Sequence, residues 1–337
     1  MEPRERLIKS IEQMPRVRLT LLPTPLENLS SLSRMYHRSI LIKRDDLTGV
    51  VFTGNKARKA EFLLGDAQRH GADIILTTGS PNSNHTRVIS AGARKLGMDV
   101  ILYIKGERPE TYTGNLLLNR IFGARFRFVG LKPYSRILEI MERDARRLRR
   151  SGHKPYVIPV GGATPVGATG YTLAFLELME QAENKGHRID TIVHCSGTGG
   201  TYAGLLYGAK VTDAKTRIIA ISDGTPKSEL IEDTAKLIDG LAEVHGIRVK
   251  LNNDIHVYDD KKYIGKGYGI PSREGISAIK LLARSEGILL DPVYSSKAMA
   301  GMIDLIRRGV LKEDETIVFL HTGGTPAIFS YSDELSR

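Results

Sequence analysis

Residues 191–202 read Thr-Ile-Val-His-Cys-Ser-Gly-Thr-Gly-Gly-Thr-Tyr, an apolar run that passes directly into a loop of serine, glycine and threonine. The β-branched start predicts a buried strand over Thr191–Cys195, and we expect a helix from Tyr202 onward. Small residues between a strand and a helix let successive backbone N–H groups converge on an anion, and the positive end of the helix dipole adds to the attraction. The segment therefore predicts an α/β unit with a phosphate-binding loop.

Further runs of β-branched and apolar residues alternate with segments whose apolar residues recur at the helical period. This alternation is typical of parallel α/β units, because each helix returns the chain to the start of the next strand and covers one face of the sheet. Glycine follows several of these runs, so we expect the loops at the carboxyl ends of the strands to approach a ligand closely. The expected strands are Ile40–Lys43, Ile74–Thr78, Val100–Ile104, Arg125–Val129, Tyr156–Val160, Thr191–Cys195, Arg217–Ser222 and Thr316–Leu320.

Four of the expected strands follow one another between Ile74 and Val160, which predicts a compact unit inserted into the rest of the chain. No proline- or serine-rich linker divides the sequence into independent halves, so the predicted domains are interleaved. We expect a small α/β domain over residues 60–164, inserted into a large domain made of residues 1–59 and 165–337.

The composition is that of an ordinary globular protein with a basic surface: 41% of the residues are apolar, 26% are charged, and the formal charge is +11. The basic residues lack interleaved aromatic residues and the chain has no Trp, which favours anionic small molecules over nucleic acid as partners. The single cysteine, Cys195, allows no internal disulfide, and residues 1–18 lack the apolar core of a signal peptide. We therefore expect a cytoplasmic location. No run approaches the roughly 20 apolar residues of a membrane-spanning helix, and we expect no membrane partner.

A lysine follows glycine in the segment Gly54-Asn55-Lys56-Ala57-Arg58-Lys59, which precedes a helix expected to start near Ala60. A lysine at such a loop-to-helix junction can be desolvated, which lowers its pKa and makes Schiff-base formation with a carbonyl group feasible. Taken alone, Lys56 is more often a solvated surface lysine.

A polar loop follows the expected strand at Ile74–Thr78 and reads Gly79-Ser80-Pro81-Asn82-Ser83-Asn84-His85. Ser83 or Asn84 alone is most simply interpreted as a helix N-cap. The same helix N-terminus would also attract an anionic group such as a substrate carboxylate. The loop is therefore a second candidate for ligand binding.

The glycine loop at 197–201 also permits a dinucleotide-binding interpretation, since Asp223 ends the next strand where a ribose-binding acid would lie. Tyr202 occupies the place of the third glycine of that motif, which argues against it. Two further segments follow apolar runs and could supply hydroxyl groups to one cleft, although Tyr294 alone is more simply a core aromatic residue. They are Asp291-Pro292-Val293-Tyr294-Ser295-Ser296-Lys297-Ala298 and His321-Thr322-Gly323-Gly324.

In this order the five segments resemble the pyridoxal 5′-phosphate (PLP)-dependent fold-type II family that holds 1-aminocyclopropane-1-carboxylate (ACC) deaminase and D-cysteine desulfhydrase. That family is itself similar to the tryptophan synthase β subunit. The resemblance extends from Arg16 to Gly324. It implies two interleaved open parallel-sheet α/β domains with the cofactor between them, the large one being the PLP-binding domain, and it implies a homodimer.

The resemblance also implies roles for individual residues. Lys56 would form the Schiff base with the cofactor aldehyde, Lys59 would reach its phosphate and Asn84 would bind the pyridoxal hydroxyl. The implied catalytic residues are Lys56, Ser83, Tyr294 and Tyr268. The implied cofactor-binding residues are Lys56, Asn55, Lys59, Asn84, Ser196, Gly197, Thr198, Gly199, Gly200, Thr201, Ser295 and Thr322. The implied substrate-binding residues are Ser83, Asn84, His85 and Tyr294, and no metal is implied.

One position distinguishes the branches of that family. The deaminases resemble one another in placing glutamate after the active-site tyrosine, facing the pyridine nitrogen, whereas this chain has Ser295, with Thr322 as a second hydroxyl. A neutral hydroxyl makes the ring a weaker electron sink, which favours α,β-elimination of a β-substituted amino acid, D-cysteine first. Thr53 and Asn82 depart from the usual glycine and glutamine. ACC deaminase, a cysteate or related lyase, and a catalytically silent PLP or amino-acid binding protein are the alternatives.

Overall fold

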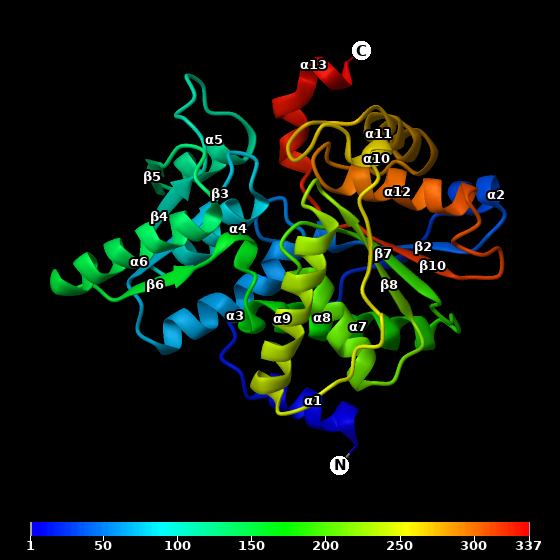
Figure 1. The fold of residues 1–337 in the computed structure, drawn as a ribbon, viewed down its shortest axis with the longest axis horizontal. Helices are drawn as coiled ribbons and strands as arrows, with labels where there is room; N and C mark the ends of the chain where they lie inside the picture. Colours follow the sequence, from blue (N-terminus) through cyan, green and yellow to red (C-terminus); the bar gives the residue numbers. More distant parts are fainter. Residues whose placement is uncertain (1, 337) are drawn as a thin grey trace.

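The computed structural model describes residues 2–336 and contains two sheets, which lie side by side in Figure 1. The larger sheet has six strands in the order β1-β2-β10-β7-β8-β9, and the smaller has four in the order β5-β4-β3-β6. All neighbouring strands are parallel except β1, which pairs antiparallel with β2. The strands are β1 Leu26–Asn28, β2 Ile40–Lys43, β3 Ile74–Gly79, β4 Asp99–Ile104, β5 Arg125–Phe128, β6 Pro155–Ile158, β7 Thr191–Ser196, β8 Arg217–Ser222, β9 His256–Tyr258 and β10 Ile317–Leu320.

Helices cover both faces of each sheet, as expected for parallel strands that are buried on two sides. In Figure 1 the helices α10, α11 and α12 lie on one side of strands β7, β8 and β10, and α7 and α8 lie on the other. The α-helices are α1 Pro3–Glu12, α2 Ser30–Tyr36, α3 Asn55–Arg69, α4 Asn84–Lys95, α5 Gly114–Ile121, α6 Tyr134–Arg150, α7 Pro165–Asn184, α8 Gly200–Val211, α9 Lys227–His245, α10 Lys261–Ile264, α11 Arg273–Glu286, α12 Ser295–Arg307 and α13 Ser332–Leu335. The 3₁₀ helices are η1 Asp45–Leu47, η2 Val160–Gly162 and η3 Thr325–Tyr331.

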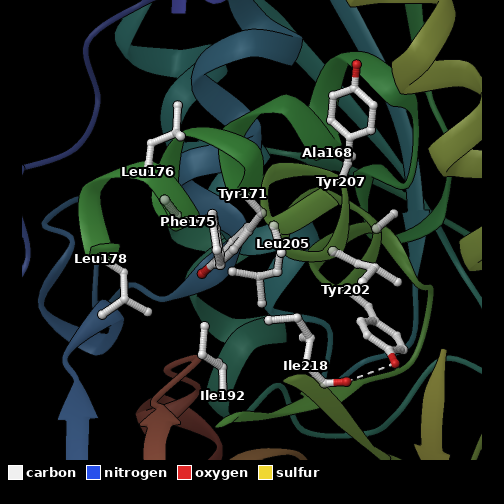
Figure 2. Packing of buried hydrophobic residues seen from close by; sticks show 14 of the residues in the cluster. Ala168, Tyr171, Phe175, Leu176, Leu178, Ile192, Tyr202, Leu205, Tyr207 and Ile218 are labelled. Carbon is white, nitrogen blue, oxygen red and sulfur yellow. Dashed lines mark hydrogen bonds between the residues drawn. The ribbon is translucent and has the colours of Figure 1, made fainter. Parts of the chain in front are cut away.

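The core of the larger sheet has two layers, one on each face, because successive side chains along a strand point to opposite faces. On β7, Ile192 packs with Tyr171, Phe175 and Leu205 from α7 and α8, and Figure 2 shows these side chains meeting above the sheet. The next residue, Val193, packs with the opposite layer that α11 and α12 provide. Burial on both faces explains why these strands are continuous apolar runs in the sequence.

The smaller sheet is covered in the same way by α3 and α4 on one face and α6 on the other. Ile75 packs with the α3 and α4 layer, whereas Ile74 packs with Ile137 and Met141 of α6. The predicted α/β class with open parallel sheets is thus confirmed. The domain limits at 59/60 and 164/165 stay a prediction, and α3 runs continuously across the first of them.

Three details differ from the sequence prediction. Helix α3 begins at Asn55 and not near Ala60, so Lys56 lies in its first turn. The reason is tertiary: the Asn55 N–H donates to the Thr322 carbonyl oxygen (3.1 Å), and this contact starts the helix early. Helix α8 likewise begins at Gly200, two residues before the expected start. The short strands β1 and β9 were not predicted, because three residues carry too little periodicity to be recognised.

Candidate functional site

A cavity of about 880 Å³ lies where the carboxyl ends of β3, β7, β8 and β10 meet loops from both sheets. This is the edge at which open parallel sheets bind ligands. Of the residues predicted for the site, the cavity wall contains all but Lys59 and Ser295: Asn55, Lys56, Ser83, Asn84, His85, Ser196, Gly197, Thr198, Gly199, Gly200, Thr201, Tyr268, Tyr294 and Thr322. Residues from six separate stretches of the sequence therefore share one cavity.

Lys56 enters this cavity from the first turn of α3. Burial lowers the pKa of its amine to about 8, while Asp223 and Cys195 act in the opposite direction. An amine with a pKa near 8 is unprotonated in a substantial fraction of molecules at neutral to mildly basic pH, and only that form attacks a carbonyl group. The environment of Lys56 therefore suits Schiff-base chemistry.

A buried ion network holds the helix turn that carries Lys56. Arg58, which is 1% exposed, pairs with Asp45 at 2.9 Å and with Glu177 at 2.8 Å. Burial alone would raise the pKa of Asp45, but the Arg58 guanidinium holds it below its usual range. Because an unpaired buried charge is costly, the network fixes Arg58 in one position, and with it the helix turn that carries Lys56.

The loop between β7 and α8 forms a cradle of backbone N–H groups at the start of a helix. Gly199 adopts a positive φ of 71° at the N-cap of α8, a conformation that favours glycine. The Asn55 side chain donates to the Thr201 hydroxyl at 2.9 Å, which ties the cradle to the start of α3. Helix N-termini with converging N–H groups bind phosphate, so this loop fits the phosphate group of PLP.

Lys59 lies directly behind the cradle, outside the cavity wall. Its amine donates to the Gly161 carbonyl oxygen at 2.9 Å, and a Cβ at Gly200 would lie only 2.4 Å from the amine nitrogen. Burial, with a further contribution from Lys56, lowers the pKa of Lys59 well below its ordinary value. A bound phosphate would be an anionic partner for this buried amine and would favour its protonated form. Lys59 therefore fits the phosphate-side role that the family resemblance implies.

The N-terminus of α4 forms the opposite wall. Ser83 is the N-cap and accepts a hydrogen bond from the Thr86 N–H at 3.3 Å, so the N-cap interpretation is also correct. The Asn84 Oδ1 accepts from Asn115 at 2.9 Å, which leaves the Asn84 amide nitrogen to donate to a ligand. A substrate carboxylate fits the remaining N–H groups at this helix end.

His85 lines the same wall but carries no charge. Burial, together with Lys56 and Lys59, lowers the pKa of His85 well below its ordinary value. Its Nε2 lies 2.8 Å from the Thr77 hydroxyl, which itself donates to the Ile158 carbonyl oxygen. Nε2 is therefore the protonated nitrogen, and His85 is a neutral imidazole that orients the helix end.

Two tyrosines, which the family resemblance implies to face the substrate, line the same cavity. The Tyr268 and Tyr294 hydroxyls are hydrogen-bonded to each other, and Ser80 lies 2.9 Å from the Tyr268 hydroxyl. The two rings meet edge to face at 5.8 Å. Desolvation raises the pKa of both phenols above the ordinary value, although Tyr268 is 39% exposed. Both are therefore neutral at physiological pH.

The two hydroxyls predicted to face the cofactor ring differ in position. Ser295 is fully buried and donates to the Asp291 carboxylate at 2.7 Å, and it is absent from the cavity wall. Thr322 lies on the wall. Thr322, and not Ser295, therefore lines the cavity, because Asp291 holds the Ser295 hydroxyl at the start of α12.

Sequence reasoning missed several residues of the cavity wall, among them Cys195, Tyr134 and Asp223. Asp223 follows β8, and an acid directly after a strand was a recognisable signal. It was interpreted only as a possible ribose ligand. The departure Asn82 does not reach the wall: its amide donates to the Tyr331 hydroxyl at 2.7 Å. The departure Thr53 is buried, and no described residue binds its hydroxyl.

Two further observations concern residues 2–336. No group of three or more His, Cys, Asp or Glu side chains is arranged to hold a metal ion. None of the described helices is long and apolar enough to cross a membrane. A second cavity of about 660 Å³, lined by residues around 206–218 and 247–256, contains none of the predicted site residues.

Comparison with known proteins identifies the family. The family model described as "Pyridoxal-phosphate dependent enzyme" matches residues 17–323. A "Putative 1-aminocyclopropane-1-carboxylate deaminase" of Pyrococcus abyssi is 39% identical over 325 residues, which are 96% of each chain. A "D-cysteine desulfhydrase" of Klebsiella pneumoniae is 39% identical over 333 residues, covering 97% of this chain and 99% of the relative.

Solved structures agree with this assignment. The crystal structure of an "ACC deaminase homologue" superposes with a TM-score of 0.91 at 40% identity, covering 100% of this chain and 99% of the other. A threonine deaminase from Solanum lycopersicum, at 19% identity and a TM-score of 0.68, shares the fold and covers 99% of this chain and 92% of its own. The expected fold type II is confirmed. The chain therefore belongs to the pyridoxal-phosphate dependent enzyme family and is a PLP-dependent enzyme of the ACC deaminase and D-cysteine desulfhydrase type.

Proposed function

We propose that the chain catalyses α,β-elimination of a β-substituted amino acid, with D-cysteine as the first candidate, giving pyruvate, sulfide and ammonia. The observation that supports this choice over ring opening is the hydroxyl of Thr322 at the cavity wall, together with a serine and not a glutamate after Tyr294. A hydroxyl opposite the pyridine nitrogen does not enforce its protonation, and a less electron-withdrawing ring suits expulsion of a β leaving group.

The residues of the cavity divide between holding the cofactor and holding the substrate. Lys56 is the residue for covalent attachment of PLP, the 197–201 loop with Lys59 is the phosphate site, and Asn84 is the donor to the ring hydroxyl. The N-terminus of α4, capped by Ser83, is the site for the substrate carboxylate. When bound, PLP supplies an electron sink for the charge that develops at the substrate Cα.

The Lys56 amine, once displaced by the substrate amine, is the base that we assign to the reaction. It takes the proton from Cα, and the Cβ–S bond breaks with its electron pair leaving on sulfur, so that a carbon–carbon double bond forms between Cα and Cβ. Water then hydrolyses the released enamine. The sum is cysteine plus water giving pyruvate, hydrogen sulfide and ammonia.

A keto-acid assay across D- and L-cysteine, cysteate, serine and ACC tests this proposal. Pyruvate and sulfide from cysteine are the expected products. Production of 2-oxobutanoate from ACC would instead favour ring opening, the activity that the names of the Pyrococcus relatives suggest. Visible absorbance that responds to amino acids, without any keto acid, would identify a silent binding protein.

We also propose that the enzyme is a homodimer in the cytoplasm. The buried, unpaired thiol of Cys195 is consistent with a reducing compartment. Sedimentation equilibrium tests the dimer, and fractionation of the native cells tests the location.

A further inference from the structure

We infer that Asp223 is a specificity-determining residue that excludes amino acids with an anionic β-substituent and admits neutral or cationic ones. This inference rests on the proposed function and narrows its substrate class. It concerns the β-substituent alone, and makes no choice between the enantiomers.

Asp223 presents a buried carboxylate to the cavity. The residue is 3% exposed and lies on the cavity wall at the end of β8. Its Oδ1 accepts hydrogen bonds from the Thr225 N–H at 3.2 Å and from the Thr225 hydroxyl at 2.9 Å. No described residue donates a hydrogen bond to Oδ2. One carboxylate oxygen is therefore left to interact with whatever enters the cavity.

The position of Asp223 is set by the cradle itself. A Cβ at Gly197 would lie 2.0 Å from Oδ2, so the carboxylate lies directly against the first glycine of the phosphate loop, where no other residue would leave it room. Burial, and then the nearby phenols and carboxylates including Asp223, raise the pKa of Tyr294. Asp223 contributes in the same direction to the pKa of Tyr268. Gly224, the next residue, packs against the Tyr268 backbone, where an added Cβ would lie 2.5 Å from the Tyr268 nitrogen. Asp223 therefore lies beside the two tyrosines of the cavity wall, which the family resemblance implies to face the substrate.

Burial raises the pKa of Asp223 above its ordinary value, and the nearby Lys297 and Lys56 amines act in the opposite direction without donating a hydrogen bond to Oδ2. The Lys297 amine donates to the backbone carbonyl oxygens of Asp223 (2.9 Å) and Gly267 (2.7 Å), not to the carboxylate. The Lys56 amine, the other cation near Asp223, is the group that attachment of the cofactor occupies.

The mouth of the cavity is balanced in charge. Glu229 and Asp233 line it together with Lys105 and Lys236. Among the described acidic residues that line the cavity, Asp223 is the buried one, and its Oδ2 accepts no hydrogen bond from a described residue. A sulfonate or phosphate on the substrate Cβ would bring a second negative charge into this low-dielectric space, where like charges repel strongly.

The test compares wild type with Asp223→Asn, which keeps the shape and removes the charge, and with Asp223→Ser as a second variant that keeps a hydrogen-bonding group. Asp213→Asn, at an exposed aspartate outside the site, is the matched control for charge removal. The probes are cysteine (neutral), cysteate (anionic) and 2,3-diaminopropanoate (cationic), each as both enantiomers. Two readouts are taken: kcat/KM from keto acid, and the probe concentration that half-shifts the visible absorbance of the bound cofactor.

We expect both Asp223 variants to raise the preference for cysteate over cysteine by roughly tenfold or more, to lower the relative affinity for 2,3-diaminopropanoate, and to leave the control unchanged. Equal preferences in the variants and wild type would overturn the inference. A preference that shifts in the absorbance titration without keto acid from any probe would uphold Asp223 as the selector and remove the proposed elimination. Turnover of cysteine by variants whose substrate preferences match those of wild type would uphold the proposed elimination and overturn the inference about Asp223.

Discussion

Replacing Lys59 by methionine tests the phosphate cradle directly. The substitution keeps the length and apolar stem of the side chain and removes only the buried amine, which donates to the Gly161 carbonyl oxygen beside the cradle. A charge-assisted hydrogen bond is worth about 1.5–3 kcal/mol. Loss of that interaction with the phosphate predicts a Kd for PLP that is about 10- to 150-fold higher.

The same variant has an opposite effect on the cofactor-free protein. Because the pKa of Lys59 is lowered in the folded state, the unfolded chain binds its proton more tightly, and protonation of this amine opposes folding. The cost is present in full below the folded pKa and disappears as the pH rises towards the unfolded value of about 10.4. We expect Lys59→Met to raise the free energy of unfolding of the apoprotein at pH 7, with a smaller gain at pH 10.

Titration of the apoprotein with PLP and with pyridoxal, followed by visible absorbance, measures the effect. Pyridoxal lacks the phosphate, so its affinity should change little in Lys59→Met. Lys154→Met, at an exposed lysine, is the matched control. An equal loss of affinity for PLP and for pyridoxal would refute the reasoning, since it would place Lys59 at the ring and not at the phosphate.

Three further changes have expected outcomes. Lys56→Ala should abolish turnover and leave no cofactor that borohydride fixes to the protein, as mass spectrometry would show; retained labelling contradicts the assignment. In wild type, the pKa of Lys56 near 8 predicts that covalent attachment of PLP accelerates as the pH rises through about 8, because the unprotonated amine is the nucleophile, and a flat stopped-flow profile from pH 6.5 to 9.5 would argue against this. Arg58→Met should lower the free energy of unfolding by about 3–5 kcal/mol, because the buried Asp45 loses its ion-pair partner and Glu177 keeps only Lys43; urea denaturation with a change below 1 kcal/mol would contradict it.

Much of the architecture was predictable because local patterns report it. All eight expected strands occur, since strands buried on both faces are continuous apolar runs that flanking glycines and helical segments delimit. The glycine loop after β7 was also recognisable from a local pattern, because small residues between a strand and a helix are typical of phosphate-binding loops. Lys56, which lines the cavity, was proposed from its place in an ordered set of motifs, because a lone lysine carries no comparable signal.

Other features depended on contacts between distant segments. The start of α3 at Asn55 depends on the carbonyl oxygen of Thr322, more than 260 positions away, which no local pattern reports. Ser295 was expected at the cofactor, but the turn at residues 291–295 directs its hydroxyl to Asp291. Asn82 was seen as a departure near the substrate, whereas its partner is Tyr331 in the C-terminal segment.

The sequence alone determined the type and order of the elements, because apolar periodicity and glycine are properties of short stretches of chain. It also predicted the glycine loop and the lysine that line the cavity, from the order of the motifs. Only the tertiary structure decided which polar groups face the ligand, because that depends on how distant segments satisfy one another's hydrogen bonds and charges. Thr322 reaches the cavity and Ser295 does not for this reason. Asp223 likewise keeps one free carboxylate oxygen there because its neighbouring lysine donates to backbone carbonyl groups instead.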